Sequence, residues 1–152
     1  MGAEFWSYWV PYQKDLDAAL QELRQREFQA GRFYQPPDTE PDFFDLVFRR
    51  RQKPSTPKPP SNIREAINTA GPTGTRSILD IKRVAERPRF YGVALLPAEE
   101  LVRLFGTDQP THAVIEQSDE LAVGIERGQG VCVVAYKDGR PDEIYFAGYS
   151  FD

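Results

Sequence analysis

Residues 130–149, GVCVVAYKDGRPDEIYFAGY, consist of two apolar runs that flank the tetrapeptide KDGR. An Asp-Gly pair between two apolar runs is among the strongest short-range signals for a β-hairpin. The sequence therefore predicts a strand from Gly130 to Tyr136, a tight turn, and a returning strand from Glu143 to about Tyr149. All other elements have to pack around these two strands.

The predicted hairpin carries apolar side chains on both faces. On its first strand both sets are apolar or aromatic: Val131, Val133 and Ala135 on one face, and Cys132, Val134 and Tyr136 on the other. A solvated antiparallel face would instead be polar at every second position. We therefore expect both faces to be covered. Helices would cover one face and residues 33–60 the other, or one aromatic face would meet a partner or ligand.

The segments around the hairpin alternate between predicted helices and strands. Residues 5–10, FWSYWV, predict a strand that ends at Pro11. Helical spacing, capping residues and glycine stops predict helices at 15–31, 61–71, 98–105 and 111–127, and a further strand is predicted at 90–96. We expect residues 1–152 to form a single α+β domain, with a mainly antiparallel sheet of about four to five strands and about four helices.

Residues 33–60 form a long, Pro-rich, basic connecting segment. Connections of this length are usually functional or disordered. The segment includes Arg49, Arg50, Arg51 and Lys53, whose positive charges favour contact with phosphate groups. Weak nucleic-acid binding is therefore one hypothesis, and the alternatives are a solvated loop or an arm that docks on the acidic C-terminal third.

Charge is distributed unevenly, although the net charge is only −4. Residues 1–48 carry four basic and nine acidic side chains, residues 49–96 eleven and three, and residues 97–152 four and eleven. The three parts therefore have net charges of −5, +8 and −7. Such a layout speeds association with a charged partner and gives no information about the fold. The two acidic parts make nucleic acid an unfavourable partner.

Cys132 and His112 are the only residues of their types, which restricts the metal chemistry of the chain. One cysteine cannot form an intramolecular disulfide and provides at most one thiolate ligand. His112, Glu116 and Glu120 would share one face of the predicted helix at 111–127. They are weak candidates for a metal site, and a solvated acidic helix face is the simpler interpretation.

Motifs for catalysis are absent from the sequence. It contains no glycine-rich phosphate loop, no zinc-protease motif and no nucleophile elbow. Two carboxylates can still perform acid–base chemistry if the fold brings them together. A small-molecule binder or hydrolase is therefore an alternative hypothesis; its candidate residues are Glu99, Glu116, Asp119, Glu120 and Glu143.

The leading hypothesis is a non-catalytic protein-interaction module of the adaptor, inhibitor or immunity type, with no cofactor. It would bind through acidic helices and aromatic sheet residues, namely Trp6, Tyr8, Trp9, Tyr145 and Tyr149. Tyr and Trp suit such surfaces because they combine a large rigid area with a polar tip. The partner would be a second copy or another protein. Cysteine usage and the absence of a membrane-length apolar run predict a cytoplasmic protein without a membrane partner.

Several phrases resemble a small bacterial protein family of uncharacterised open reading frames. They are WVPYQKDLDAALQELRQREFQAGR at 9–32, GTRSILDI at 74–81, LFGTDQPT at 104–111 and DGRPDEIYFAGYSFD at 138–152. The resemblance covers most of the chain outside about 35–60. It implies a free-standing, single-domain bacterial protein, and it implies no activity, cofactor or catalytic residue.

Overall fold

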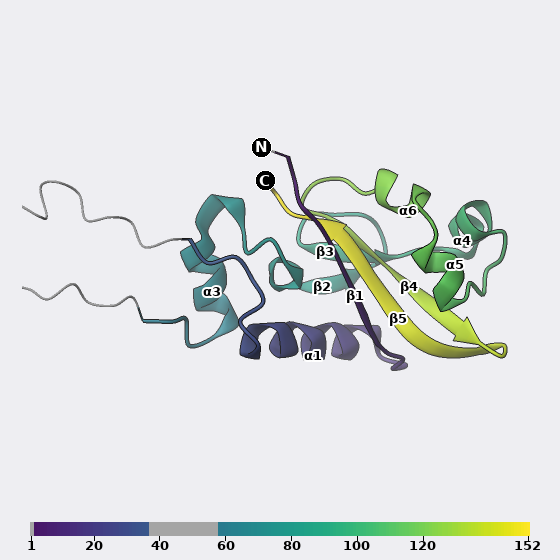
Figure 1. The fold of residues 1–152 in the computed structure, drawn as a ribbon, viewed down its shortest axis with the longest axis horizontal. Coiled ribbons are helices and arrows are strands. Elements are labelled where there is room, and N and C mark those ends of the chain that lie inside the picture. Colours follow the sequence, from purple (N-terminus) through teal and green to yellow (C-terminus); the bar gives the residue numbers. More distant parts are fainter. Residues whose placement is uncertain (1, 37–57) are drawn as a thin grey trace, which may run out of the picture.

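A mixed β-sheet lies at the centre of the structure (Figure 1). The computed structural model describes residues 2–36 and 58–152. Within these residues the sheet has five strands in the order β1-β5-β4-β3-β2. The strands are β1 (Phe5–Pro11), β2 (Arg83–Ala85), β3 (Gly92–Leu95), β4 (Gly130–Lys137) and β5 (Arg140–Tyr149). The predicted α+β class is confirmed.

The prediction of a mainly antiparallel sheet needs correction. β5 pairs antiparallel with both β1 and β4, but β3 pairs parallel with both β4 and β2. The reason lies in the chain between β3 and β4, which contains helices and returns to the end of the sheet where β3 began. A crossover of this kind places the next strand parallel to the previous one.

The hairpin of β4 and β5 is confirmed, and it is longer than predicted. Asp138 and Gly139 both have positive φ, 52° and 73°, as a two-residue turn that matches the twist of the strands requires. Pairing therefore continues to Lys137 and Arg140 beside the turn, so β5 begins three residues before Glu143.

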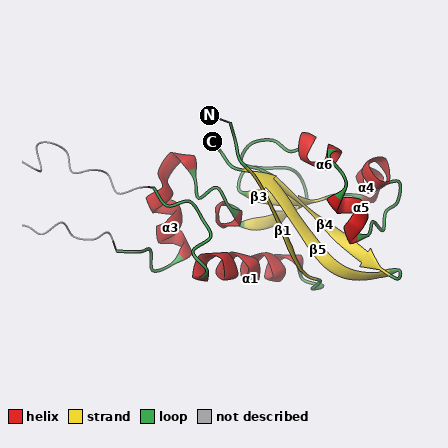
Figure 2. Cartoon of the chain, in the orientation of Figure 1, coloured by secondary structure: helices red, strands yellow, loops and turns green. Residues whose placement is uncertain are grey.

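The described residues contain five α-helices, drawn in red in Figure 2. They are α1 (Leu16–Gln29), α3 (Ile63–Ala70), α4 (Ala98–Phe105), α5 (His112–Glu116) and α6 (Glu120–Val123). Asp15 caps α1 by accepting a hydrogen bond from the backbone N–H of Ala18. Asn62 caps α3 by accepting a hydrogen bond from the N–H of Glu65.

The single helix predicted at 111–127 is wrong, because the chain breaks there into α5 and α6. Ile115 and Leu121 are both buried against the same face of the sheet. Six residues apart, they would point to different sides of one continuous helix. A break at Gln117–Asp119 allows both side chains to reach the sheet.

One face of the sheet packs against α1 and the turn at Ile78–Asp80. The cluster on this side contains Leu20, Leu23 and Ile78 from the cover, and Cys132 and Phe146 from the sheet. Burial raises the pKa of the Cys132 thiol to about 12, so this side chain acts as a small apolar residue and stays protonated. The cluster is the larger of the two parts of the core.

The opposite face packs against α4, α5 and α6. Val133, Tyr145 and Ala147 of the sheet lie here against Ile115 and Leu121. The expectation that both faces are covered is therefore confirmed. Its assignment of one face to residues 33–60 needs correction, because helices supply the cover on both sides; most of that segment lies outside the described residues.

Candidate functional site

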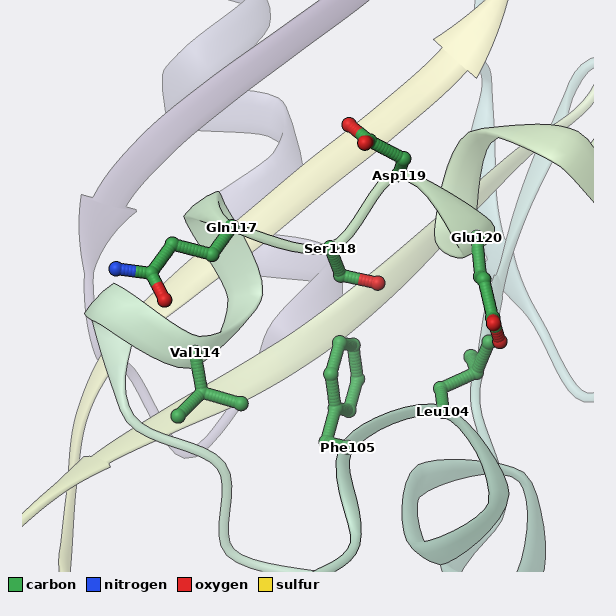
Figure 3. Close-up of a pocket in the computed structure, with 7 residues that line it drawn as sticks. All are labelled: Leu104, Phe105, Val114, Gln117, Ser118, Asp119 and Glu120. Atoms are coloured by element: carbon green, nitrogen blue, oxygen red, sulfur yellow. The ribbon is translucent and has the colours of Figure 1, made fainter.

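A hollow lies between α4, α5 and α6 on the outer side of the helical layer (Figure 3). It has a volume of about 520 Å³ and is open to solvent. Seven residues line it: Leu104, Phe105, Val114, Gln117, Ser118, Asp119 and Glu120. Its apolar part comes from the end of α4 and the middle of α5, and its polar part from the break between α5 and α6.

Local sequence signals position the walls of the hollow. α4 ends at Gly106, whose φ of 74° is the left-handed conformation that glycine adopts readily at the end of a helix. Thr111 then starts α5, because its side chain accepts a hydrogen bond from the N–H of Val114. The resulting turn directs α5 back across the end of α4, and Leu104 and Val114 face the same space.

Apolar side chains on this side of the molecule are unusually exposed. Val102 on α4 is 52% exposed, Val114 on α5 is 38% exposed and Val123 on α6 is 84% exposed. Single exposed apolar residues are ordinary, and of these three only Val114 lines the hollow, beside Leu104 and Phe105. We call these three valines together with the hollow the α4–α6 surface.

The α4–α6 surface is also strongly acidic. Residues 98–126 contain seven acidic side chains and one basic side chain, Arg103. Arg103 is already bound by Glu100 at 2.7 Å, and this bond lowers the pKa of the Glu100 carboxyl. In the described part of the chain, Arg103 is the only Lys or Arg side chain that forms an ion pair with an acidic residue of 98–126, so the local charge is strongly negative.

The carboxylates at the hollow do not converge. Asp119 and Glu120 both line it, but Figure 3 shows Asp119 pointing away from Phe105 while Glu120 extends toward Leu104. Glu99 is on the exposed part of α4. Acid–base catalysis requires two groups within reach of one substrate bond. Asp119 and Glu120 therefore do not form a catalytic pair at this hollow, whereas Glu116 and Glu143, two other predicted residues, both contact His112.

His112 joins α5 to the sheet rather than to Glu120. Its Nδ1 lies 2.7 Å from Glu143 on β5, and its Nε2 lies 3.8 Å from Glu116. The ring stacks on the indole of Trp9 at 3.8 Å, and Trp9 donates its Nε1–H to Glu116 at 2.5 Å. These contacts hold α5, and with it one wall of the hollow, against β1 and β5.

The predicted metal set of His112, Glu116 and Glu120 needs correction. Glu116 ends α5 and Glu120 begins α6, so the three residues do not share a helix face. Within residues 2–36 and 58–152, no group of three or more His, Cys, Asp or Glu side chains could hold a metal ion. The prediction failed because it assumed one continuous helix.

The five predicted aromatic interaction residues occupy different environments. Trp6 and Tyr145 are buried, at 6% and 8% exposure, in opposite halves of the core. Tyr8, Trp9 and Tyr149 are half-buried. A partner cannot reach Trp6 or Tyr145 without unpacking the core. Val102, Val114 and Val123 were not among the predicted interaction residues, because their exposure depends on how α4, α5 and α6 pack.

Other predicted residues and comparisons add little to this site. Arg49, Arg50, Arg51 and Lys53 lie outside the described residues. No helix in the described part of the chain is sufficiently long and apolar to cross a membrane.

No protein-family model, curated protein or solved structure matches this chain. The resemblance to a small bacterial family therefore stays a prediction.

Proposed function

We propose that this protein is a non-catalytic interaction module that binds an apolar, positively charged segment of a partner protein on its α4–α6 surface. The observation that carries the proposal is the open hollow with Leu104, Phe105 and Val114 in its wall, set within a strongly acidic surface. An adaptor, an inhibitor or an immunity protein would act in this way. A bacterial, cytoplasmic, single-domain protein is the setting that the sequence supports.

The two properties of the surface have different roles in binding. Apolar side chains gain about 25 cal/mol for each Å² that a partner removes from water. The uncompensated acidic charge accelerates the encounter with a basic partner and rejects an acidic one. An amphipathic helix with Lys or Arg on its polar face satisfies both requirements.

The alternative functions have less support. A hydrolase needs convergent carboxylates, whereas Asp119 and Glu120 diverge at the hollow. Glu116 and Glu143 both contact His112, but neither lines the hollow. Nucleic-acid binding was based on Arg49, Arg50, Arg51 and Lys53, which the structure does not describe, and the α4–α6 surface would repel phosphate groups. Both alternatives remain outcomes that a binding experiment can distinguish.

Replacing Val114 with aspartate is expected to weaken binding of a fluorescent amphipathic peptide of Leu and Lys by at least about tenfold. The substitution places a charge in the apolar wall, and Val114 is sufficiently exposed that the fold tolerates the change. Fluorescence anisotropy gives the dissociation constant, and circular dichroism verifies the fold. The same peptide with Glu in place of Lys is expected not to bind.

Two matched charge reversals distinguish the effect of local charge at the α4–α6 surface from the effect of the net charge of the protein. Glu120→Lys changes the hollow, whereas Glu86→Lys makes the same change at an exposed position on the basic β2–β3 connection. We expect Glu120→Lys to weaken peptide binding and Glu86→Lys to leave it almost unchanged. Equal effects of the two reversals, or no effect of Val114→Asp, would show that the α4–α6 surface is not the binding site.

A further inference from the structure

Among residues 2–36 and 58–152, strand β1 is the last strand on its side of the sheet, and no strand pairs with its outer edge. The N–H of Ser150 donates to the carbonyl of Glu4, and the N–H of Tyr12 donates to the carbonyl of Asp142. In an antiparallel pair, the residues that bond to the neighbouring strand alternate along the chain. The even-numbered residues of β1 therefore face β5, and the backbone groups of Phe5, Ser7 and Trp9 point away from the sheet.

This outward edge lacks the features that usually protect edge strands. Proteins protect such edges with charged side chains, bulges or internal prolines. Residues 5–10 contain no charged residue, and the register between β1 and β5 is continuous from Phe5 to Pro11. Pro11 removes a donor only at the last position of the strand. No other strand of the described residues pairs with this edge.

The sequence of β1 is close to a palindrome about Ser7. In FWSYWV, an antiparallel pair centred on Ser7 places Phe5 opposite Trp9 and Trp6 opposite Tyr8. Phe5, Ser7 and Trp9 carry the outward-facing backbone groups of β1. If the pair is centred on Ser7, every outward N–H and C=O of these three residues can bond to the second strand. Aromatic cross-strand pairs and a pair of hydroxyl residues are both favourable in antiparallel sheets.

We propose that β1 is a self-association edge, at which a second copy of this chain pairs antiparallel with the first and the two-fold axis passes between the two Ser7 residues. The two sheets then continue into one another. Phe5 is 44% exposed and Ser7 is exposed, so both can meet the second copy without leaving the core. This edge is distinct from the α4–α6 surface, so the two proposals can fail independently.

A second copy fits this edge better than an arbitrary extended peptide does. The strand is uncharged between Glu4 and Lys14, so two copies bring no like charges into opposition. Antiparallel pairing of β1 from two copies also follows the rule that a two-fold interface uses the same patch on both molecules. The aromatic residues lie at equal distances on either side of Ser7, so a symmetric pairing also places aromatic side chains opposite one another.

Ser7→Lys is expected to abolish the association, because it places two like charges opposite each other at the axis. The control is Gln25→Lys, which adds the same charge at an exposed position on α1. Sedimentation equilibrium from micromolar to millimolar concentration should show monomer and dimer for the wild type and Gln25→Lys. Ser7→Lys should remain monomeric, with a dissociation constant weakened at least about tenfold. A wild type that is monomeric throughout, or a Ser7→Lys variant as dimeric as the wild type, overturns the proposal.

A covalent trap gives an independent readout of the register. Directly opposed residues of a hydrogen-bonded antiparallel pair have Cα atoms about 5.5 Å apart, within the range that a disulfide spans. Under mild oxidation, Ser7→Cys should form a disulfide-linked dimer on a non-reducing gel, whereas Gln25→Cys should not. The native Cys132 is buried and does not interfere. Equal amounts of linked dimer from the two variants would contradict the proposed register.

Discussion

Replacing Phe146 with alanine is expected to lower the free energy of unfolding by about 3–5 kcal/mol. Phe146 is the largest fully buried side chain described, and it lies on β5 within the cluster that joins the sheet to α1. β5 pairs on both sides, so it has little freedom to shift toward the cavity. The lower free energy of unfolding therefore includes two terms: the burial free energy that the removed ring atoms no longer contribute, and the cost of the cavity that remains. Denaturant unfolding followed by circular dichroism measures it.

Phe90 provides a matched control for this substitution. It lies in the connection between β2 and β3 and is 58% exposed. Phe90→Ala removes the same atoms and is expected to change the free energy of unfolding by less than about 0.5 kcal/mol. Similar losses for the two variants would mean that the assignment of the core around β5 is wrong.

Replacing Asp80 with alanine is expected to lower the free energy of unfolding by about 1–3 kcal/mol. The Asp80 carboxylate is buried, and its Oδ1 accepts hydrogen bonds from both the N–H and the hydroxyl of Thr75, each at 2.8 Å. Alanine leaves the buried N–H of Thr75 without this partner, while the Thr75 hydroxyl keeps its hydrogen bond with Ser77 at 2.8 Å. Gly74 fits closely against the same carboxylate, because a Cβ at that position would lie 2.6 Å from Oδ2. The loop at 71–77 is therefore folded around Asp80.

The Asp80→Asn variant distinguishes the contribution of these hydrogen bonds to stability from that of the buried charge. Asparagine keeps the acceptor at Oδ1 and removes the buried negative charge. Desolvation by burial raises the pKa of the Asp80 carboxyl above its ordinary value of 3.8. The folded state therefore binds more protons than the unfolded state above that value, and the contribution of Asp80 to stability is lost as the pH rises through the folded pKa.

The stability of Asp80→Asn relative to the wild type is thus expected to increase as the pH rises from about 4. Unfolding at a series of pH values measures this difference. Glu27 acts in the opposite direction, because its hydrogen bond with Arg32 lowers the pKa of its carboxyl. This effect is common to both proteins and cancels in the comparison. A difference that does not vary with pH would contradict the account of Asp80.

The hairpin and the apolar character of both sheet faces could be predicted because they depend on neighbouring residues. Asp138 and Gly139 determine the turn, and alternation along β4 and β5 determines the faces. The parallel pairing of β3 could not be predicted in the same way. It depends on how the α4–α6 connection packs, and its strands show continuous apolar runs that do not indicate a direction.

The proposed binding surface was predicted only in its chemistry. Acidic helices were expected, and they surround the hollow, but the aromatic residues Trp6 and Tyr145 proved to be core. An aromatic side chain on a strand is equally suited to an interior and to an interface. Only the positions of the covering helices distinguish these uses, and those positions depend on the break after Glu116.

The most direct test of the α4–α6 surface is a map of amide chemical shifts when the ¹⁵N-labelled protein is titrated with the Leu/Lys peptide. The largest shifts are expected within residues 98–126, above all beside Val114 and Glu120, and the affinity should fall as salt is added, since salt screens exposed charges. Largest shifts elsewhere in the protein, or an affinity that salt leaves unchanged, would contradict the proposed binding site.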